Sequence, residues 1–147
     1  MYFTLSLLNM RQNTRKSLCI LSIIILVSCQ ADQKLKGNYA ICYNEEYTEV
    51  FFKEDSMRAA SGTHTHYLSE WRKIKRVKDT LYFQTFGEWR DSVKAIVTNV
   101  GANKINLRML NNDDYLHLEP IDEDIYLEDF KVFWDGFYER KRLSKCK

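Results

Sequence analysis

The sequence predicts a mainly β protein: an eight-stranded antiparallel meander, either closed into a barrel or strongly curled, followed by one C-terminal amphipathic helix. Three observations support this fold class. From Gly37 onward, short alternating or β-branched segments are separated by turn residues. This region contains a single proline, Pro120, and no low-complexity tract. After residue 121, apolar residues recur every three or four positions instead of every second position, which is typical of an amphipathic helix.

The strand predictions follow from alternation and from the turns between segments. In residues 38–44, Tyr39 and Ile41 share one face while Cys42 lies on the other. Region 67–78 also has apolar residues at helical spacing, but we interpret it as mostly strand leading into a hairpin at Asp79. The other predicted strands are 47–53, 56–64, 81–86, 92–100, 105–109 and 115–119. Closure of such a meander would remove its exposed edges.

The predicted helix covers about residues 123–137, where aromatic and aliphatic side chains recur every three or four positions. Acidic residues lie at its N-terminal end, and Arg140, Lys141 and Arg142 lie beyond Gly136 at its C-terminal end, a charge order that suits the helix dipole. We expect its aromatic face to pack on the wall of the sheet or to plug one mouth. The tail would then bring Cys146 back to the first strand, near Cys42.

The N-terminal region has the parts of a secretory signal. Basic residues precede an apolar run, 17–28, which ends in Leu-Val-Ser directly before Cys29. This pattern resembles the lipobox of bacterial lipoprotein precursors, which implies cleavage after Ser28 and acylation of Cys29. The run is shorter than the roughly 20 apolar residues that span a bilayer. An uncleaved anchor or a plain secretory signal is the alternative, and Met10 is an alternative start.

The resemblance implies a protein tethered to a lipid bilayer, because two or three acyl chains on one cysteine anchor a protein stably. Residues 29–36 would form the lipidated N-terminus and a polar spacer. Cys29-Gln30-Ala31-Asp32 also resembles the export signal of Bacteroidetes lipoproteins, in which Gln or Lys precedes acidic residues. This implies an outer-membrane location, on the periplasmic face or at the cell surface.

Cleavage would leave 119 of the 147 residues, enough for one domain, 37–147, with its own core. The net charge is +2, and because three basic and no acidic residues lie in 1–28, the mature chain has a charge of −1. Nucleic acid is therefore not an implied partner.

The mature chain would retain two cysteines besides the acylated one. Cys42 and Cys146 would meet in an oxidising compartment, so we expect a disulfide that closes a loop of about a hundred residues. Free or metal-bound thiols are the alternative, although two cysteines alone are an incomplete zinc set.

Leu35-Lys36-Gly37-Asn38-Tyr39 opens the first strand, and with eight strands and a helix it resembles small bacterial lipocalin-like lipoproteins. Tyr39 stands where that family has the tryptophan of its Gly-x-Trp motif. Other eight-stranded barrels, such as periplasmic lysozyme inhibitors, fit the same pattern. The resemblance implies a barrel that binds a small molecule.

Candidate ligand-binding residues are the aromatics Tyr82, Trp89 and Tyr115, which would line a mouth and stack on a sugar or hydrophobic ligand. Core packing is the alternative for each of them. Region 72–78 is strongly basic. Its side chains could attract an anionic surface, or they could protect a sheet edge from pairing with another chain; we favour edge protection.

We expect no enzyme, cofactor or metal site. The sequence has no nucleophile elbow, zinc-protease motif or phosphate-binding glycine loop. His64 and His66 would share a strand face, but a metal needs a third ligand and His117 is distant in sequence. The sequence thus predicts a non-enzymatic envelope lipoprotein that binds a small hydrophobic or sugar ligand. A tethered inhibitor or immunity-type interaction protein is the alternative.

Overall fold

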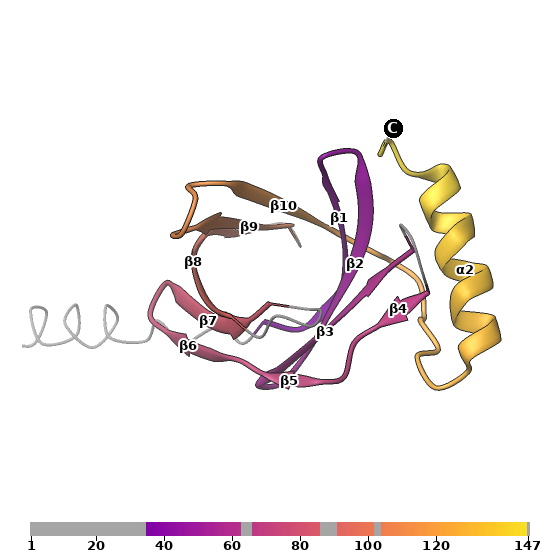
Figure 1. Cartoon of the computed structure of the whole chain (residues 1–147), viewed down its shortest axis with the longest axis horizontal. Coiled ribbons are helices and arrows are strands. Elements are labelled where there is room, and N and C mark those ends of the chain that lie inside the picture. The colour runs from indigo at the N-terminus through magenta and orange to yellow at the C-terminus, as the bar shows by residue number, and fades with distance from the viewer. Residues whose placement is uncertain (1–34, 63–65, 86–90, 102–103, 147) are drawn as a thin grey trace, which may run out of the picture. The chain divides into compact units, whose positions relative to one another are not determined.

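The computed structural model describes residues 35–62, 66–85, 91–101 and 104–146, which belong to one compact unit, Lys34–Lys147. Its described elements are ten strands and one helix (Figure 1). The strands are β1 Gly37–Tyr43, β2 Glu46–Lys53, β3 Ser56–Ser61, β4 Tyr67–Leu68, β5 Arg72–Lys73, β6 Lys75–Val77, β7 Thr80–Gln84, β8 Ser92–Gly101, β9 Lys104–Met109 and β10 Tyr115–Pro120.

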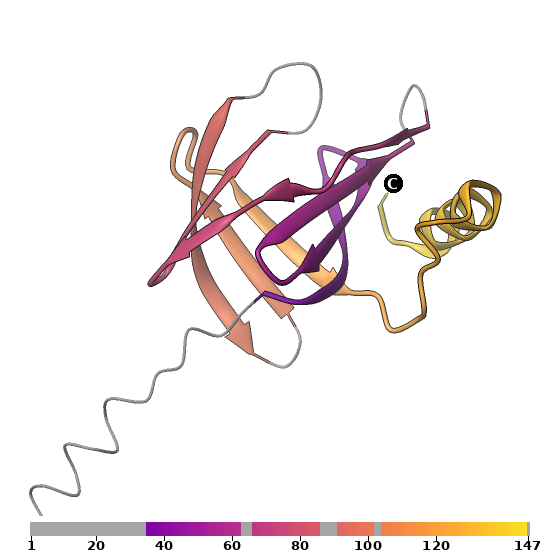
Figure 2. The ribbon, with the colours of Figure 1, turned by 90° about the horizontal axis from the view of Figure 1, so that it is seen from below.

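The strands form one antiparallel, strongly curled sheet in the order β4-β3-β2-β1-β10-β9-β8-β7-β6, while β5 pairs with β3. The mainly β class, the curl and the C-terminal helix were thus predicted correctly. The strand count differs from the predicted eight because region 67–78 is divided into three short strands. Figures 1 and 2 show this region crossing from β3 to β7, so its pairing partner changes along its length.

The first and last strands lie side by side, although they are far apart in the sequence. Ile41 of β1 is opposite Leu118 of β10, and Tyr39 is opposite Pro120. Apart from the pairing of β5 with β3, the other interstrand pairs join neighbours in sequence, for example β1 with β2 across the tight turn at Asn44 and Glu45. This pairing pattern curls the meander around an apolar interior.

The helix, α2, covers Phe130–Leu143 rather than the predicted 123–137. It begins later because the Asp129 carboxylate accepts a hydrogen bond from the Val132 amide and caps the first turn. Gly136 does not end the helix but lies inside it, where the Arg140 guanidinium packs so closely that a Cβ on Gly136 would lie 2.9 Å from Nη1. The helix continues to Leu143, with the basic residues in its last turn.

Side-chain alternation in β2 gives the protein two apolar clusters. Val50 and Phe52 face the inside of the curl, whereas Tyr47 and Phe51 face outward and pack against α2. The helix therefore covers the wall of the sheet and does not plug a mouth (Figures 1 and 2). We call the outer cluster the helix-covered wall; its buried members are Tyr47, Phe51, Ala60, Phe133, Trp134 and Phe137.

Candidate functional site

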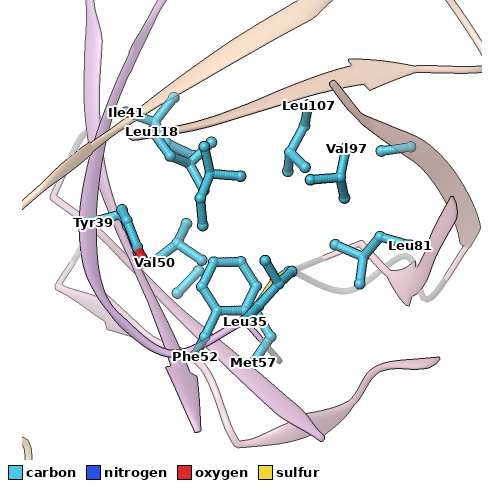
Figure 3. Packing of buried hydrophobic residues seen from close by; sticks show 13 residues of the cluster. Leu35, Tyr39, Ile41, Val50, Phe52, Met57, Leu81, Val97, Leu107 and Leu118 are labelled. Carbon is cyan, nitrogen blue, oxygen red and sulfur yellow. The ribbon is translucent and has the colours of Figure 1, made fainter. Parts of the chain in front are cut away.

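The inside of the curl is lined by side chains from both halves of the sheet. Figure 3 shows Val50 and Phe52 facing Leu107 and Val97 across the interior. These positions alternate with outward residues along each strand, so the apolar lining follows directly from the period of two in the sequence. The buried members of this inner cluster are Leu35, Tyr39, Ile41, Val50, Phe52, Met57, Ala59, Leu81, Ala95, Val97, Ile105, Leu107 and Leu118.

These side chains do not fill the interior completely. A cavity of about 210 Å³ remains, which we call the inner cavity. Its lining is almost entirely apolar: Ile41, Tyr43, Thr48, Val50, Phe52, Met57, Ala59, Phe83, Leu107, Met109, Leu116 and Leu118. The volume is below the roughly 300–1,000 Å³ of pockets for drug-sized ligands, so it suits one aliphatic chain better than a fused ring system.

Two polar groups lie among the lining residues of the inner cavity. The Tyr43 hydroxyl donates a hydrogen bond to the Asp114 carboxylate, and this bond and the carboxylate charge raise the pKa of the hydroxyl. Thr48 lines the same side, in the neighbouring strand β2. Among the described lining residues there is no charged side chain, so the cavity selects for apolar groups.

The structure separates the aromatic residues predicted to share one ligand site. Tyr82 and Tyr115 both project outward, and both are partly exposed, but they lie on β7 and β10. Three strand spacings, about 14 Å, separate those strands in the sheet order. Trp89 lies outside the described residues. Tyr82 and Tyr115 therefore do not form one stacking surface, and neither lines the inner cavity.

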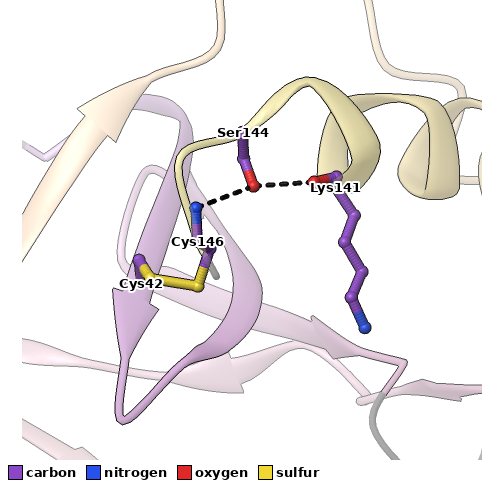
Figure 4. Close-up of a disulfide and its surroundings, with 4 residues drawn as sticks. All are labelled: Cys42, Lys141, Ser144 and Cys146. Carbon is purple, nitrogen blue, oxygen red and sulfur yellow. Dashed lines mark hydrogen bonds between the residues drawn. A yellow bond between two sulfur atoms is a disulfide. The ribbon is translucent and has the colours of Figure 1, made fainter.

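The expected disulfide is present between Cys42 and Cys146, with their Cα atoms 5.3 Å apart (Figure 4). Cys42 points outward from β1, on the side that α2 covers, as the alternation predicted. The Ser144 hydroxyl donates to the Lys141 carbonyl and accepts from the Cys146 amide, which turns the chain from the helix toward β1. The bond thus ties the end of α2 to the wall beneath it.

A buried ion pair joins the same wall to the helix. Glu49 is fully buried on the outward face of β2, and its two carboxylate oxygens accept from Arg140 at 2.7 and 3.1 Å. The Tyr47 hydroxyl donates to Glu49 at 2.8 Å, and Arg140 also donates to Glu123. Every charged atom of the pair is therefore matched, as burial requires.

The ion pair also changes the acid–base properties of its neighbours. Burial, the Glu49 charge and the hydrogen bond to it raise the pKa of Tyr47 well above its usual range. Burial disfavours the charged guanidinium of Arg140, but its hydrogen bonds to Glu49 and Glu123 outweigh this and raise its pKa. Both groups keep their protons at neutral pH, so the network is a structural connection that neither donates nor removes protons there.

The histidines do not meet in one place among the described residues. The His66 ring packs edge-on against Trp134 at 4.8 Å, whereas His117 pairs with Asn106 at 2.7 Å on β9 and β10. His64 lies outside the described residues. Within the described part of the chain, no group of three His, Cys, Asp or Glu residues is placed to hold a metal ion.

Cys29 and the predicted signal also lie outside the described residues, so lipidation stays a prediction. No helix among the residues that the structure describes is long and apolar enough to cross a membrane.

Comparison of the chain with protein-family models, with curated proteins and with solved structures found no match.

Sequence reasoning missed the Glu49–Arg140 pair, although a signal was present. Glu49 alternates with Tyr47 and Phe51, so an acid occupies the middle of an aromatic, outward strand face. Arg140 follows Phe137 by three residues, on the buried face of the helix. An acid and a base, each within an aromatic face, indicate a buried pair between those faces.

Proposed function

We propose that this chain is an outer-membrane lipoprotein, anchored through acylated Cys29, that binds a small hydrophobic ligand inside its curled sheet and catalyses no reaction. The observation that carries the binding proposal is the inner cavity of about 210 Å³ with its apolar lining. An apolar hollow of this size offers a small molecule a surface on which its own apolar groups leave water, and this favours a ligand. A sugar is less well suited to this cavity because its hydroxyls would lose their hydrogen bonds there.

The finer architecture belongs to the same proposal. If Tyr67–Val77 acts as one irregular strand, the meander becomes an eight-stranded barrel with the inner cavity at its centre. In support, β5 pairs with β3 and β6 pairs with β7, while the Ile74 amide between them donates to the Asp55 carbonyl at 2.7 Å. Arg72 of β5 also donates to the Thr85 carbonyl, directly after β7. These bonds connect the two ends of the sheet through one segment.

Native mass spectrometry of the protein purified gently from its own host envelope tests ligand binding. We expect an adduct of a small hydrophobic molecule, because the cavity offers apolar surface and no competing charge. Ala59→Leu would fill the cavity and should abolish the adduct, since Ala59 is one of the lining residues. Val132→Leu, on the exposed side of α2, is the matched control and should keep it. A bare mass for the unmodified protein would contradict the proposal.

Cys29→Ala tests the anchor separately. The variant should be released as a soluble, unlipidated product, because the acyl chains supply the membrane affinity. Recovery of this variant in the membrane fraction would favour an uncleaved signal anchor and would contradict lipidation.

A tethered interaction protein is the second candidate, and the exposed side of α2 favours it. Phe130 and Tyr138 are 64% and 39% exposed there, lie on one face of the helix, and both contact the His66 ring. Large exposed apolar side chains in a group are typical of protein contacts. A protein that copurifies with the chain and is lost in Phe130→Ser, while Glu139→Ser retains it, would support this candidate over the ligand-binding one.

A further inference from the structure

A second hollow lies where β5 and β6 meet β7 and β8. Its volume is about 630 Å³, three times that of the inner cavity, and its lining is mainly polar, basic and aromatic. We call it the basic groove and define it by Trp71, Lys73, Lys75, Tyr82 and Lys94.

Strand register places the central residues of the basic groove in one row. Lys75 of β6 is opposite Tyr82 of β7, and Tyr82 is opposite Lys94 of β8. Directly opposed residues project to the same face of a sheet, here the outer one, because Leu81 and Phe83 on either side of Tyr82 pack on the inner cluster. Tyr82 thus lies between two lysines on neighbouring strands, each strand being about 5 Å from β7.

The described residues that line the basic groove carry more positive than negative charge. Glu70 is the only acidic residue among the described lining residues, against four basic ones. Among the described residues, no carboxylate forms an ion pair with Lys73, Lys75 or Lys94. The mature chain as a whole would be almost neutral, so this positive region is local. Such a region concentrates anions from solution.

The rings of the basic groove are accessible to a ligand. Tyr82 is 37% exposed and Trp71 is 38% exposed. The Lys94 ammonium lies 5.7 Å from the centre of the Tyr82 ring, so the cation lies within reach of whatever stacks there. Edge protection explains Lys75 of the terminal strand β6, but it explains neither Lys94 in the interior of the sheet nor the two exposed rings.

From this arrangement we infer that the basic groove binds an acidic saccharide, a sugar carrying carboxylate or phosphate groups. The apolar face of a sugar ring stacks on Tyr82 or Trp71, and its anionic group pairs with Lys75, Lys94 or Lys73. The inference does not depend on the inner cavity, because none of these five residues lines that cavity.

Isothermal titration calorimetry on the full-length lipoprotein, in a polyoxyethylene detergent that contains no sugar, tests this inference. The probes are trigalacturonate and glucose 6-phosphate, with neutral maltotriose and inorganic phosphate for comparison. We expect saturable binding of at least one acidic sugar, roughly tenfold tighter than maltotriose and than phosphate, because ring and charge are both recognised. Binding should weaken as salt is added.

Variants locate the site. Lys75→Gln and Lys94→Gln should each weaken binding about two- to fivefold, as the loss of one exposed ion pair does. Tyr82→Ala should weaken it about five- to tenfold, and Tyr82→Phe should retain it because the ring remains. Matched controls outside the groove, Lys104→Gln on β9 and Tyr115→Ala on β10, should bind like the unmodified protein.

Three results would overturn the inference. If maltotriose binds as tightly as the acidic sugars, the groove does not recognise charge. If inorganic phosphate binds as tightly as the acidic sugars, the groove does not recognise the sugar ring. Equal losses in the groove variants and their controls would place the binding elsewhere, for example on an anionic lipid surface. The Ala59→Leu variant, which blocks the inner cavity, should leave acidic-sugar binding unchanged, so this test and the test of the hydrophobic ligand can fail independently.

Discussion

The inner cluster and the helix-covered wall share strands β2 and β3 but are built differently. The inner cluster is mainly aliphatic and leaves a cavity of about 210 Å³. The wall is mainly aromatic, with rings in edge-to-face contact, such as Phe51 on Phe133 and Tyr47 on Phe137. It also contains a buried ion pair and lies beside the disulfide.

This difference suggests how the small domain combines stability with a hollow interior. A cavity forfeits packing energy, so the stability must come from elsewhere. The helix-covered wall offers dense ring packing and one covalent bond, and its buried ion pair makes it sensitive to the loss of either charged partner. We therefore expect the protein to be sensitive to changes at the wall and tolerant of changes around the cavity.

The largest effect should come from breaking the disulfide. Its cysteines are 104 residues apart in sequence. In the chain-entropy model, replacing both Cys42 and Cys146 by alanine should lower the free energy of unfolding by about 4–5 kcal/mol. Urea denaturation of the variant and of the unmodified protein measures this difference. Intact mass after alkylation is the check on the bond itself. Uptake of two alkyl groups without a reductant would show that the thiols are free.

Glu49→Ala should cost nearly as much, about 3–5 kcal/mol, because it leaves the Arg140 guanidinium partly buried without its main partner. Lys131→Ala is the matched control. It removes an exposed ion pair with Asp135 on the same helix and should cost less than about 0.5 kcal/mol. Similar losses of stability in the two variants would mean that solvent screens the Glu49–Arg140 pair as well. The expectation that the helix-covered wall is especially sensitive to substitution would then be wrong.

Two neighbouring alanines compare the regions most directly. Ala59 and Ala60 are adjacent in β3 and both buried, but Ala59 lines the cavity and Ala60 packs under the helix. Ala60→Val should cost about 1–3 kcal/mol through overpacking. Ala59→Val should be neutral or slightly stabilising, because its methyl groups enter the cavity and valine favours strands. Equal losses, measured by thermal unfolding of both variants, would show that the interior is as tightly packed as the wall.

Most strands could be predicted from the sequence because each has a clear period of two and ends in turn residues. Region 67–78 was ambiguous for a physical reason: it changes partner from β3 to β7, so it never forms one continuous ladder. The helix was placed too early because the acidic residues before Asp129 suggested its first turn. In fact Asp129 caps the helix, and no acidic residue lies in that turn.

The candidate sites were less predictable than the fold. The Cys42–Cys146 bond followed from cysteine number and the expected compartment. The inner cavity did not, because a hollow depends on how completely side chains fill a volume, and alternation gives only the direction in which they point. The shared site of Tyr82 and Tyr115 failed for a related reason, since sequence gives their face but not the number of strands between them.

The smallest effect concerns the pH dependence that Tyr47 gives the wall. Its usual pKa is 10.0, and burial beside Glu49 raises that pKa in the folded protein. Above pH 10 the unfolded chain therefore releases this proton while the folded chain keeps it, so its contribution to stability is complete below pH 10 and is lost as the pH rises further. The free energy of unfolding should fall by up to about 1.4 kcal/mol more per pH unit in the unmodified protein than in Tyr47→Phe. Denaturation series between pH 9 and 11 measure the difference, and parallel curves would show that the Tyr47 hydroxyl is not enclosed by the wall.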